Sequence, residues 1–254
     1  MTIVMVHGNP ETDAIWWPLV EQLGRDDVVL LSPPGFGAPL PDGFGATHAE
    51  YRDWLEAELS RFSEPVDLVG HDWGGGHVLN LVMHRPELVR SWVSDVVGIY
   101  DPEYVWHDLA QVWSTPGAGE ELVQTMIGGT LAERIAGAEG LGMPPDVAAA
   151  VAAGQNEEMQ RAILALYRSA VQPVVAELGR SLDRAAQRPG LAILATEDQF
   201  VGTEEMRRRS AARAGARVEV LEGLGHWWML EDPARGAAAL TRFWGAASGG
   251  TLPH

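Results

Sequence analysis

One aspartate in this sequence stands where a nucleophile could act. Asp72 lies in the segment Gly70-His71-Asp72-Trp73-Gly74, between a predicted buried strand and a predicted helix. Glycine two positions before and two positions after the central residue is typical of a nucleophile elbow, a turn too tight for side chains at the flanking positions. The alternative interpretation is a glycine-rich turn in which Asp72 caps the following helix.

Two further segments favour the nucleophile interpretation. His226 lies in a glycine-rich loop directly after the last predicted strand, and Asp198 follows the strand before it. Asp198 offers a carboxylate that could orient the imidazole of His226. The segment His7-Gly8-Asn9-Pro10 follows the first strand, where a backbone N–H can form an oxyanion hole together with the N–H of Trp73. Nucleophile, acid and base therefore follow one another at the ends of three strands.

An aspartate at the elbow limits the reaction. Carboxylate attack on an ester or amide would give an anhydride, a poor intermediate, whereas attack on a saturated carbon with a leaving group gives a stable alkyl ester. His226 could then activate water to attack the ester carbonyl on Asp72. The N–H groups of Asn9 and Trp73 would stabilise the resulting oxyanion. Epoxides and alkyl halides both fit this scheme.

Alternating strands and helices would position these residues. Six apolar runs predict buried strands, at residues 2–6, 27–31, 66–69, 89–97, 191–195 and 217–221. Helical segments separate them, so the pattern predicts a parallel sheet covered by helices on both faces.

The alternation stops between residues 100 and 186, where no strand is predicted. An all-helical insertion here predicts a lid over the carboxyl ends of the strands, where open α/β sheets bind ligands. The alternative is a helical domain with no share in the site. We expect an α/β core of residues 1–99 and 187–247, a helical cap of residues 100–186 and a flexible tail of residues 248–254.

Together these motifs resemble the α/β-hydrolases of the epoxide hydrolase and haloalkane dehalogenase branch, over nearly the whole chain. The shared segments are His-Gly-Asn-Pro at 7–10, Gly-His-Asp-Trp-Gly-Gly at 70–75, Asp198, Gly-His at 225–226 and Met-Leu-Glu-Asp-Pro at 229–233. The resemblance implies Asp72 as nucleophile, His226 as base and Asp198 as its partner, with no cofactor. The family usually has a β-hairpin before the first strand, so a chain starting at Met1 should form a mostly parallel sheet of about six strands without that hairpin.

Residues of the predicted lid indicate which class of substrate the protein could use. The segment Leu164-Ala165-Leu166-Tyr167-Arg168 resembles the part of epoxide hydrolase lids that carries a proton-donating tyrosine, which makes Tyr167 the candidate donor. Its alternative role is a half-buried tyrosine that holds lid helices together. The usual second tyrosine is missing from residues 101–116, where Trp106 and His107 lie and Tyr104 is slightly early, so a Trp N–H or His107 could replace it.

The resemblance therefore implies that the protein opens an epoxide to a vicinal diol. A haloalkane dehalogenase is the first alternative, because Asn9 and Trp73 match the family residues that hold the halide. A hydrolase-fold protein that binds a ligand without turnover is the second. Further pocket residues are expected to be His7, Trp106, His107, Trp113 and Trp227. The indole rings of the three Trp suggest a small apolar or aromatic substrate.

The composition excludes other classes of function. Thirty-five acidic and 18 basic residues give a net charge of −17, which argues against binding to nucleic acid or anionic membrane surfaces. The absence of Cys and Lys excludes thiol nucleophiles, Schiff-base chemistry and a phosphate-loop lysine. The eight His lack metal-ligand spacing, and no apolar stretch is long enough to span a membrane. We expect a cytoplasmic monomer or homodimer without metal or cofactor.

Overall fold

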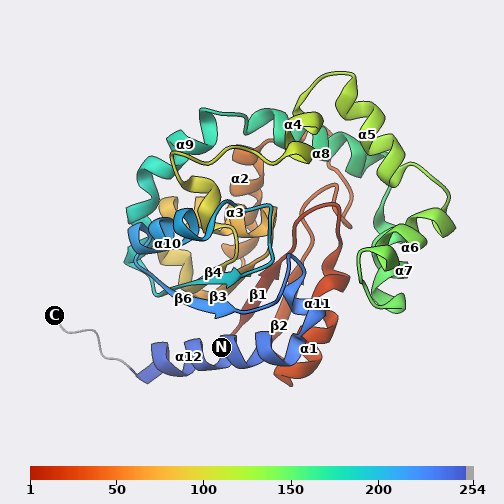
Figure 1. Cartoon of the computed structure of the whole chain (residues 1–254). Helices are drawn as coiled ribbons and strands as arrows, with labels where there is room; N and C mark the ends of the chain where they lie inside the picture. The colour runs from red at the N-terminus through yellow and green to blue at the C-terminus, as the bar shows by residue number, and fades with distance from the viewer. Residues whose placement is uncertain (250–254) are drawn as a thin grey trace.

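A six-stranded parallel sheet forms the centre of the computed structural model, which describes residues 1–249 (Figure 1). The strand order is β2-β1-β3-β4-β5-β6, and all neighbouring strands are parallel. The strands are β1 (Ile3–Val6), β2 (Val28–Leu31), β3 (Val66–Gly70), β4 (Val89–Ser94), β5 (Gly190–Ala195) and β6 (Ala216–Leu221). The prediction of a parallel sheet of about six strands is therefore confirmed.

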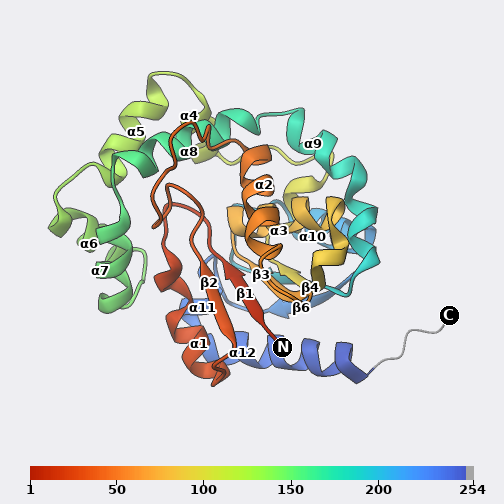
Figure 2. The same ribbon diagram turned by 180° about the vertical axis from the view of Figure 1, so that it is seen from behind.

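Helices cover both faces of the sheet, which explains why β1 and β5 are buried along their whole length. One face carries α2 (His48–Leu59), α3 (Trp73–His84) and α10 (Glu204–Arg213) (Figures 1 and 2). The other face carries α1 (Trp17–Leu23), α11 (Trp228–Glu231) and α12 (Pro233–Gly249). Side chains alternate along each strand, so Val4 and Val6 join the first apolar cluster and Ile3 and Met5 join the second.

The connection between β4 and β5 is helical. It contains α4 (Asp108–Ser114), α5 (Ala118–Ile127), α6 (Leu131–Gly140), α7 (Pro145–Gly154), α8 (Glu157–Ser169) and α9 (Val174–Leu178). α4, α5 and α8 pack together above the sheet, and α6 and α7 pack against each other to one side (Figures 1 and 2). The 3₁₀ segment Gly179–Gln187 ends this connection and packs against α3 of the core.

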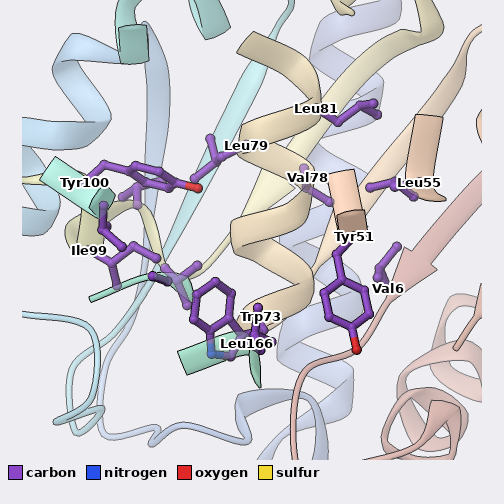
Figure 3. Packing of buried hydrophobic residues seen from close by; sticks show 14 of the residues in the cluster. Val6, Tyr51, Leu55, Trp73, Val78, Leu79, Leu81, Ile99, Tyr100 and Leu166 are labelled. Carbon is purple, nitrogen blue, oxygen red and sulfur yellow. The ribbon is translucent and has the colours of Figure 1, made fainter. Parts of the chain in front are cut away.

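The first apolar cluster continues from the sheet into these helices. Tyr51 and Leu55 of α2 lie close to Val6 of β1 beside the buried face of α3 (Figure 3). Trp73, the first residue of α3, and Leu166 of α8 are both buried in this cluster (Figure 3). The start of α3 is therefore the point where core and lid helices share one apolar interior.

The last helix is longer than we expected. α12 continues to Gly249, so residues 248 and 249 of the predicted flexible tail are helical, and residues 250–254 lie outside the described part of the chain. No helix of the described chain is both long enough and apolar enough to cross a membrane.

Candidate active site

The turn between β3 and α3 presents Asp72. Its φ of 48° and ψ of −129° are strained for a residue with a side chain, and such strain is found where surrounding structure holds a functional group in place. Glycine is required on both sides, because a Cβ at Gly70 would lie 2.5 Å from Gly74 O and one at Gly74 would overlap Val6 O. The Asp72 side chain makes no capping hydrogen bond to α3, which removes the capping interpretation.

His226 and Asp198 meet Asp72 from the ends of two other strands. His226 Nδ1 lies 2.9 Å from Asp198 Oδ2, and its Nε2 lies 3.9 Å from Asp72 Oδ1. Burial opposes protonation of His226, but the Asp198 carboxylate outweighs burial and raises the pKa of the imidazole above its usual value. The Asp198 carboxylate is also fixed in position, because its Oδ1 accepts a 2.8 Å hydrogen bond from Phe200 N.

The loop after β1 supplies donors to the other oxygen of Asp72. Asn9 N lies 3.0 Å from Asp72 Oδ2, and Asn9 Nδ2 lies 3.2 Å from the same oxygen. The backbone N–H of Trp73 also favours the ionised carboxylate and so lowers its pKa. Burial nevertheless dominates and raises the pKa of Asp72 to about 6, although the nearby His226 opposes this shift.

Tyr167 reaches the same place from α8. Its ring meets Trp73 edge-on, with 5.4 Å between ring centroids, and the N–H groups of the Asn9 and Trp73 side chains act to lower the pKa of its hydroxyl. Burial, reinforced by the Asp72 carboxylate, raises the pKa of Tyr167 well above its usual value. Tyr167 is therefore a protonated hydroxyl beside Asp72, and its side chain is buried against the rings of Trp73 and Trp113.

A cavity of about 130 Å³ connects these groups. Its wall contains the predicted residues Asn9, Asp72, His107, Trp113, Tyr167, His226 and Trp227. Apolar side chains complete it, namely Pro10, Leu109, Met126, Leu141 and Phe200. Residues of the helical connection and of the α/β core therefore line one small, largely apolar cavity.

Two predicted pocket residues lie behind this wall. His7 is fully buried, and its Nδ1 donates a 2.8 Å hydrogen bond to Gly8 O at the end of β1. Trp106 donates its indole N–H to Ala170 O at 3.0 Å, and its ring stacks on Trp73. The expectation that His7 and Trp106 line the cavity is corrected, because local hydrogen bonds and stacking turn both side chains into the interior.

A buried charged cluster behind Asp72 was not predicted. His71 Nδ1 lies 2.5 Å from Asp95 Oδ2, and its Nε2 lies 3.3 Å from Glu11 Oε1. Asp95 also accepts a 3.1 Å hydrogen bond from Asp72 N. Burial opposes protonation of His71, but the two carboxylates outweigh burial and raise its pKa well above the usual value. His71 is therefore an imidazolium whose ring centroid lies 4.6 Å from that of His226.

This cluster also ties the surrounding loops together. Glu11 Oε2 accepts a 3.2 Å hydrogen bond from Gly8 N, and Glu11 Oε1 accepts one from Trp227 Nε1. Asp95 directly follows β4, and Asp72 likewise comes just after β3. The position of Asp95 at the end of a strand could therefore have predicted that it belongs to the site. Nothing in the local sequence marks Glu11, whose partners come from distant segments.

The same residues form the one group of potential metal ligands found in the described chain. Glu11, His71 and His226 bring one ligand atom each within 4.8 Å of one another. Both nitrogens of His71 face carboxylates, and His226 Nδ1 binds Asp198. Both His71 nitrogens are thus engaged with carboxylates, so ion pairing accounts for the closeness of Glu11 and His71.

Comparisons with known proteins identify the family. The model of the alpha/beta hydrolase family matches residues 3–239. No curated protein sequence matches the chain. The solved structure of DBJA is 18% identical, with a TM-score of 0.75 over 100% of this chain and 93% of that one.

Two further solved structures have the same fold. The haloalkane dehalogenase DbeA from Bradyrhizobium elkani is 18% identical, with a TM-score of 0.69 over 96% of this chain and 91% of that one. The carboxylesterase CesB (YbfK) from Bacillus subtilis is 17% identical, with a TM-score of 0.61 over 96% and 83%. The structures establish the fold, and the match of the family model extends over nearly the whole sequence. The chain therefore belongs to the alpha/beta hydrolase family.

Proposed function

We propose that this protein hydrolyses an epoxide to a vicinal diol through a covalent ester on Asp72. The observation that carries the proposal is the position of Tyr167, a buried, protonated hydroxyl that lines the same cavity as Asp72 and His226. An epoxide oxygen leaves as an alkoxide and needs such an acidic O–H. The cavity has nearly the volume of one that holds benzene, about 150 Å³, which suits a small aromatic epoxide.

In the first step, one carboxylate oxygen of Asp72 attacks an epoxide carbon. Oδ2 is bound by Asn9, so Oδ1, which faces His226, is the oxygen free to attack. A bond forms between Oδ1 and carbon while the carbon–oxygen bond of the ring breaks. Tyr167 transfers its proton to the leaving oxygen, which becomes the first hydroxyl of the diol.

In the second step, water attacks the Asp72 carboxyl carbon of the ester. His226 Nε2 accepts a proton from this water, and Asp198 stabilises the imidazolium that forms. The negative charge on Oδ2 is stabilised by the backbone N–H of Asn9, which already contacts this oxygen, and by the nearby backbone N–H of Trp73. Collapse of the intermediate breaks the ester bond, and the leaving alkoxide takes the remaining water proton from the Asp72 carboxyl, which releases the diol and the Asp72 carboxylate. The proton on His226 restores the Tyr167 hydroxyl.

Dehalogenation is the second candidate, favoured by two donors beside the nucleophile. The side-chain N–H groups of Asn9 and Trp73 lie near enough to the Tyr167 hydroxyl to influence its pKa, so a halide at this place would find two N–H donors. Three solved structures with a similar fold, each 17–18% identical, are described as haloalkane dehalogenases. The chemistry at Asp72 would be the same, with a halide as the leaving group.

Turnover of styrene oxide and of 2-phenylethyl bromide distinguishes the candidates. We expect diol from styrene oxide, and we expect Tyr167→Phe to lower its kcat by roughly 100-fold, the effect of one lost general acid. Diol is measured by chromatography and bromide by a halide electrode. Bromide release that exceeds diol formation would favour the dehalogenase. Absence of both products would contradict an Asp72-dependent hydrolase of either kind.

A further inference from the structure

Arg207 of α10 is a buried cation that the proposed mechanism does not use. It is only 5% exposed, whereas the next residue, Arg208, is exposed and forms an ion pair with Glu204 at 2.6 Å. No carboxylate of residues 1–249 forms an ion pair with Arg207, and its Nε–H has no hydrogen-bond partner in that part of the chain. Burying a cation in this way costs free energy, so its position calls for an explanation besides packing.

The guanidinium binds the turn that carries Asp198. Its Nη1 donates a 2.7 Å hydrogen bond to Ala195 O at the end of β5, and its Nη2 donates a 3.2 Å hydrogen bond to Asp198 O. Ala195 O also accepts a 3.3 Å hydrogen bond from Asp198 N, which closes the turn. The planar fork of Arg207 therefore joins the first and last residues of this turn.

The turn decides where the Asp198 carboxylate lies. Oδ2 lies 2.9 Å from His226 Nδ1, and Oδ1 accepts a hydrogen bond from Phe200 N, so both oxygens have partners. The aspartate side chain is short, so its carboxylate moves with the backbone from which it projects. A displaced turn would therefore remove the acceptor that faces His226 Nδ1.

The charge of Arg207 acts on the same carboxylate. Burial lowers the pKa of Arg207, while the carboxylates of Asp198 and, less strongly, Glu204 act in the opposite direction. Attraction between two charges is mutual, so the guanidinium favours the ionised form of Asp198. An ionised Asp198 accepts the Nδ1–H of His226 and leaves Nε2 free to accept a proton from water.

We propose that Arg207 is a positioning residue that holds Asp198 ionised and facing His226 Nδ1, and so selects the tautomer of His226 that serves as the base. The inference rests on the proposed function, in which this base is needed only for hydrolysis of the ester on Asp72. Formation of the ester uses Asp72 and Tyr167. Loss of Arg207 should therefore slow the second step selectively.

Arg207→Met removes both hydrogen bonds and the charge, and Arg208→Met is the matched control on the exposed side of α10. Nitrogen-15 NMR, at a pH above the titration of His226, measures which ring nitrogen carries the proton. We expect Nδ1–H in the wild-type protein and in Arg208→Met. Arg207→Met should shift the ratio of the two tautomers about tenfold towards Nε2–H, the effect of about 1.4 kcal/mol.

An unchanged ratio in folded Arg207→Met, or an equal shift in Arg208→Met, would overturn the inference. The wild-type protein supplies a test that does not depend on folding of a variant. The Nη protons of Arg207 should exchange with solvent at least about 100-fold more slowly than those of Arg208, because both nitrogens donate to buried carbonyl oxygens. Equal exchange rates would show that the turn is not held by Arg207.

Rapid quenching and intact-protein mass spectrometry follow formation and decay of the ester during a single turnover of styrene oxide. Decay of the ester should be about tenfold slower in Arg207→Met, whereas its formation should change by less than about threefold. Equal slowing of both steps would overturn the inference, because a merely structural residue would affect them alike.

The tautomer measurement needs no turnover, so this inference and the proposed function fail separately. The expected tautomer shift in a protein that leaves styrene oxide intact would contradict the proposed function alone. Hydrolysis of styrene oxide through the ester, with an unchanged tautomer ratio in Arg207→Met, would contradict the role of Arg207 alone.

Discussion

At the scale of single residues, the site depends on Asp72 being charged in a place that disfavours charge. Burial is the largest influence on this carboxyl and outweighs His226, so its pKa is about 6. The hydrogen bonds from Asn9 and the nearby backbone N–H of Trp73 act in the other direction and favour the charged form. A partly desolvated carboxylate is a better nucleophile than one in water, because less hydration must be removed before attack.

The first prediction concerns the pH dependence of epoxide opening. Only ionised Asp72 attacks carbon, and its raised pKa means that the ionised form is lost as pH falls through about 6. We expect kcat/KM for styrene oxide to fall about tenfold per pH unit below that value. No alkaline decline is expected up to pH 9, since the pKa of Tyr167 lies well above its usual value.

Stopped assays between pH 4.5 and 9, with circular dichroism to confirm folding at each pH, test this prediction. A constant kcat/KM down to pH 4.5 in folded protein would show that Asp72 keeps an ordinary pKa or need not ionise.

At the scale of elements, the site is assembled from loops that follow different strands. The loop after β1 holds Asn9 and Glu11, the turn after β3 holds His71 and Asp72, and Asp95 follows β4. Carboxyl ends of parallel strands lie at one edge of a sheet, which is why residues so distant in sequence meet here. The buried cluster of Glu11, His71 and Asp95 joins these loops beneath the nucleophile.

Glu11→Gln tests the structural importance of this cluster. Burial opposes ionisation of Glu11, but the adjacent His71 outweighs it and lowers the pKa of the carboxyl. The amide removes one charge of a buried ion pair and places an N–H group against His71 or Trp227. Breaking a buried pair in this way should lower the free energy of unfolding by about 3 kcal/mol.

Urea unfolding measures the effect, with Glu21→Gln as the matched control. Glu21 is exposed on α1, so the same chemical change there should alter stability by less than about 0.5 kcal/mol. Equal effects of the two substitutions would show that the buried cluster contributes nothing specific to stability.

Sequence patterns predicted the elements and the residues at strand ends, but not how the side chains between them pack. Glycine spacing around Asp72 and the glycine-rich loop before His226 are local signals, because each turn has its own steric demand. Glu11 depends on contacts with Gly8, His71 and Trp227, which exist only after three segments converge. We expected His7 and Trp106 to line the cavity, and this was wrong for the same reason, because side-chain packing between distant segments cannot be predicted from local patterns.

At the scale of the whole molecule, the net charge of −17 surrounds an apolar cavity. A field of this sign repels anionic substrates and has little effect on neutral ones. Salt screens this repulsion over a length of about 10 Å at 0.1 M. The overall charge should therefore select among substrates before the site is reached.

Salt dependence of turnover tests this selection. Raising the ionic strength from 10 to 150 mM should increase kcat/KM severalfold for 4-carboxystyrene oxide, because screening weakens repulsion of its carboxylate. Styrene oxide, the neutral control, should change little. Equal salt responses of the two epoxides would show that the field of the protein does not reach the approaching substrate.

The covalent role of Asp72 is the central claim, and intact-protein mass spectrometry of His226→Gln tests it most directly. This substitution removes the base for ester hydrolysis and leaves Asp72 free to attack, so styrene oxide should accumulate as a protein adduct with the full mass of the epoxide. Peptide mapping should place the adduct on Asp72, and Asp72→Asn/His226→Gln should form none. If wild-type protein produces diol while His226→Gln traps no adduct on Asp72, water attacks the epoxide directly and the proposed mechanism is wrong.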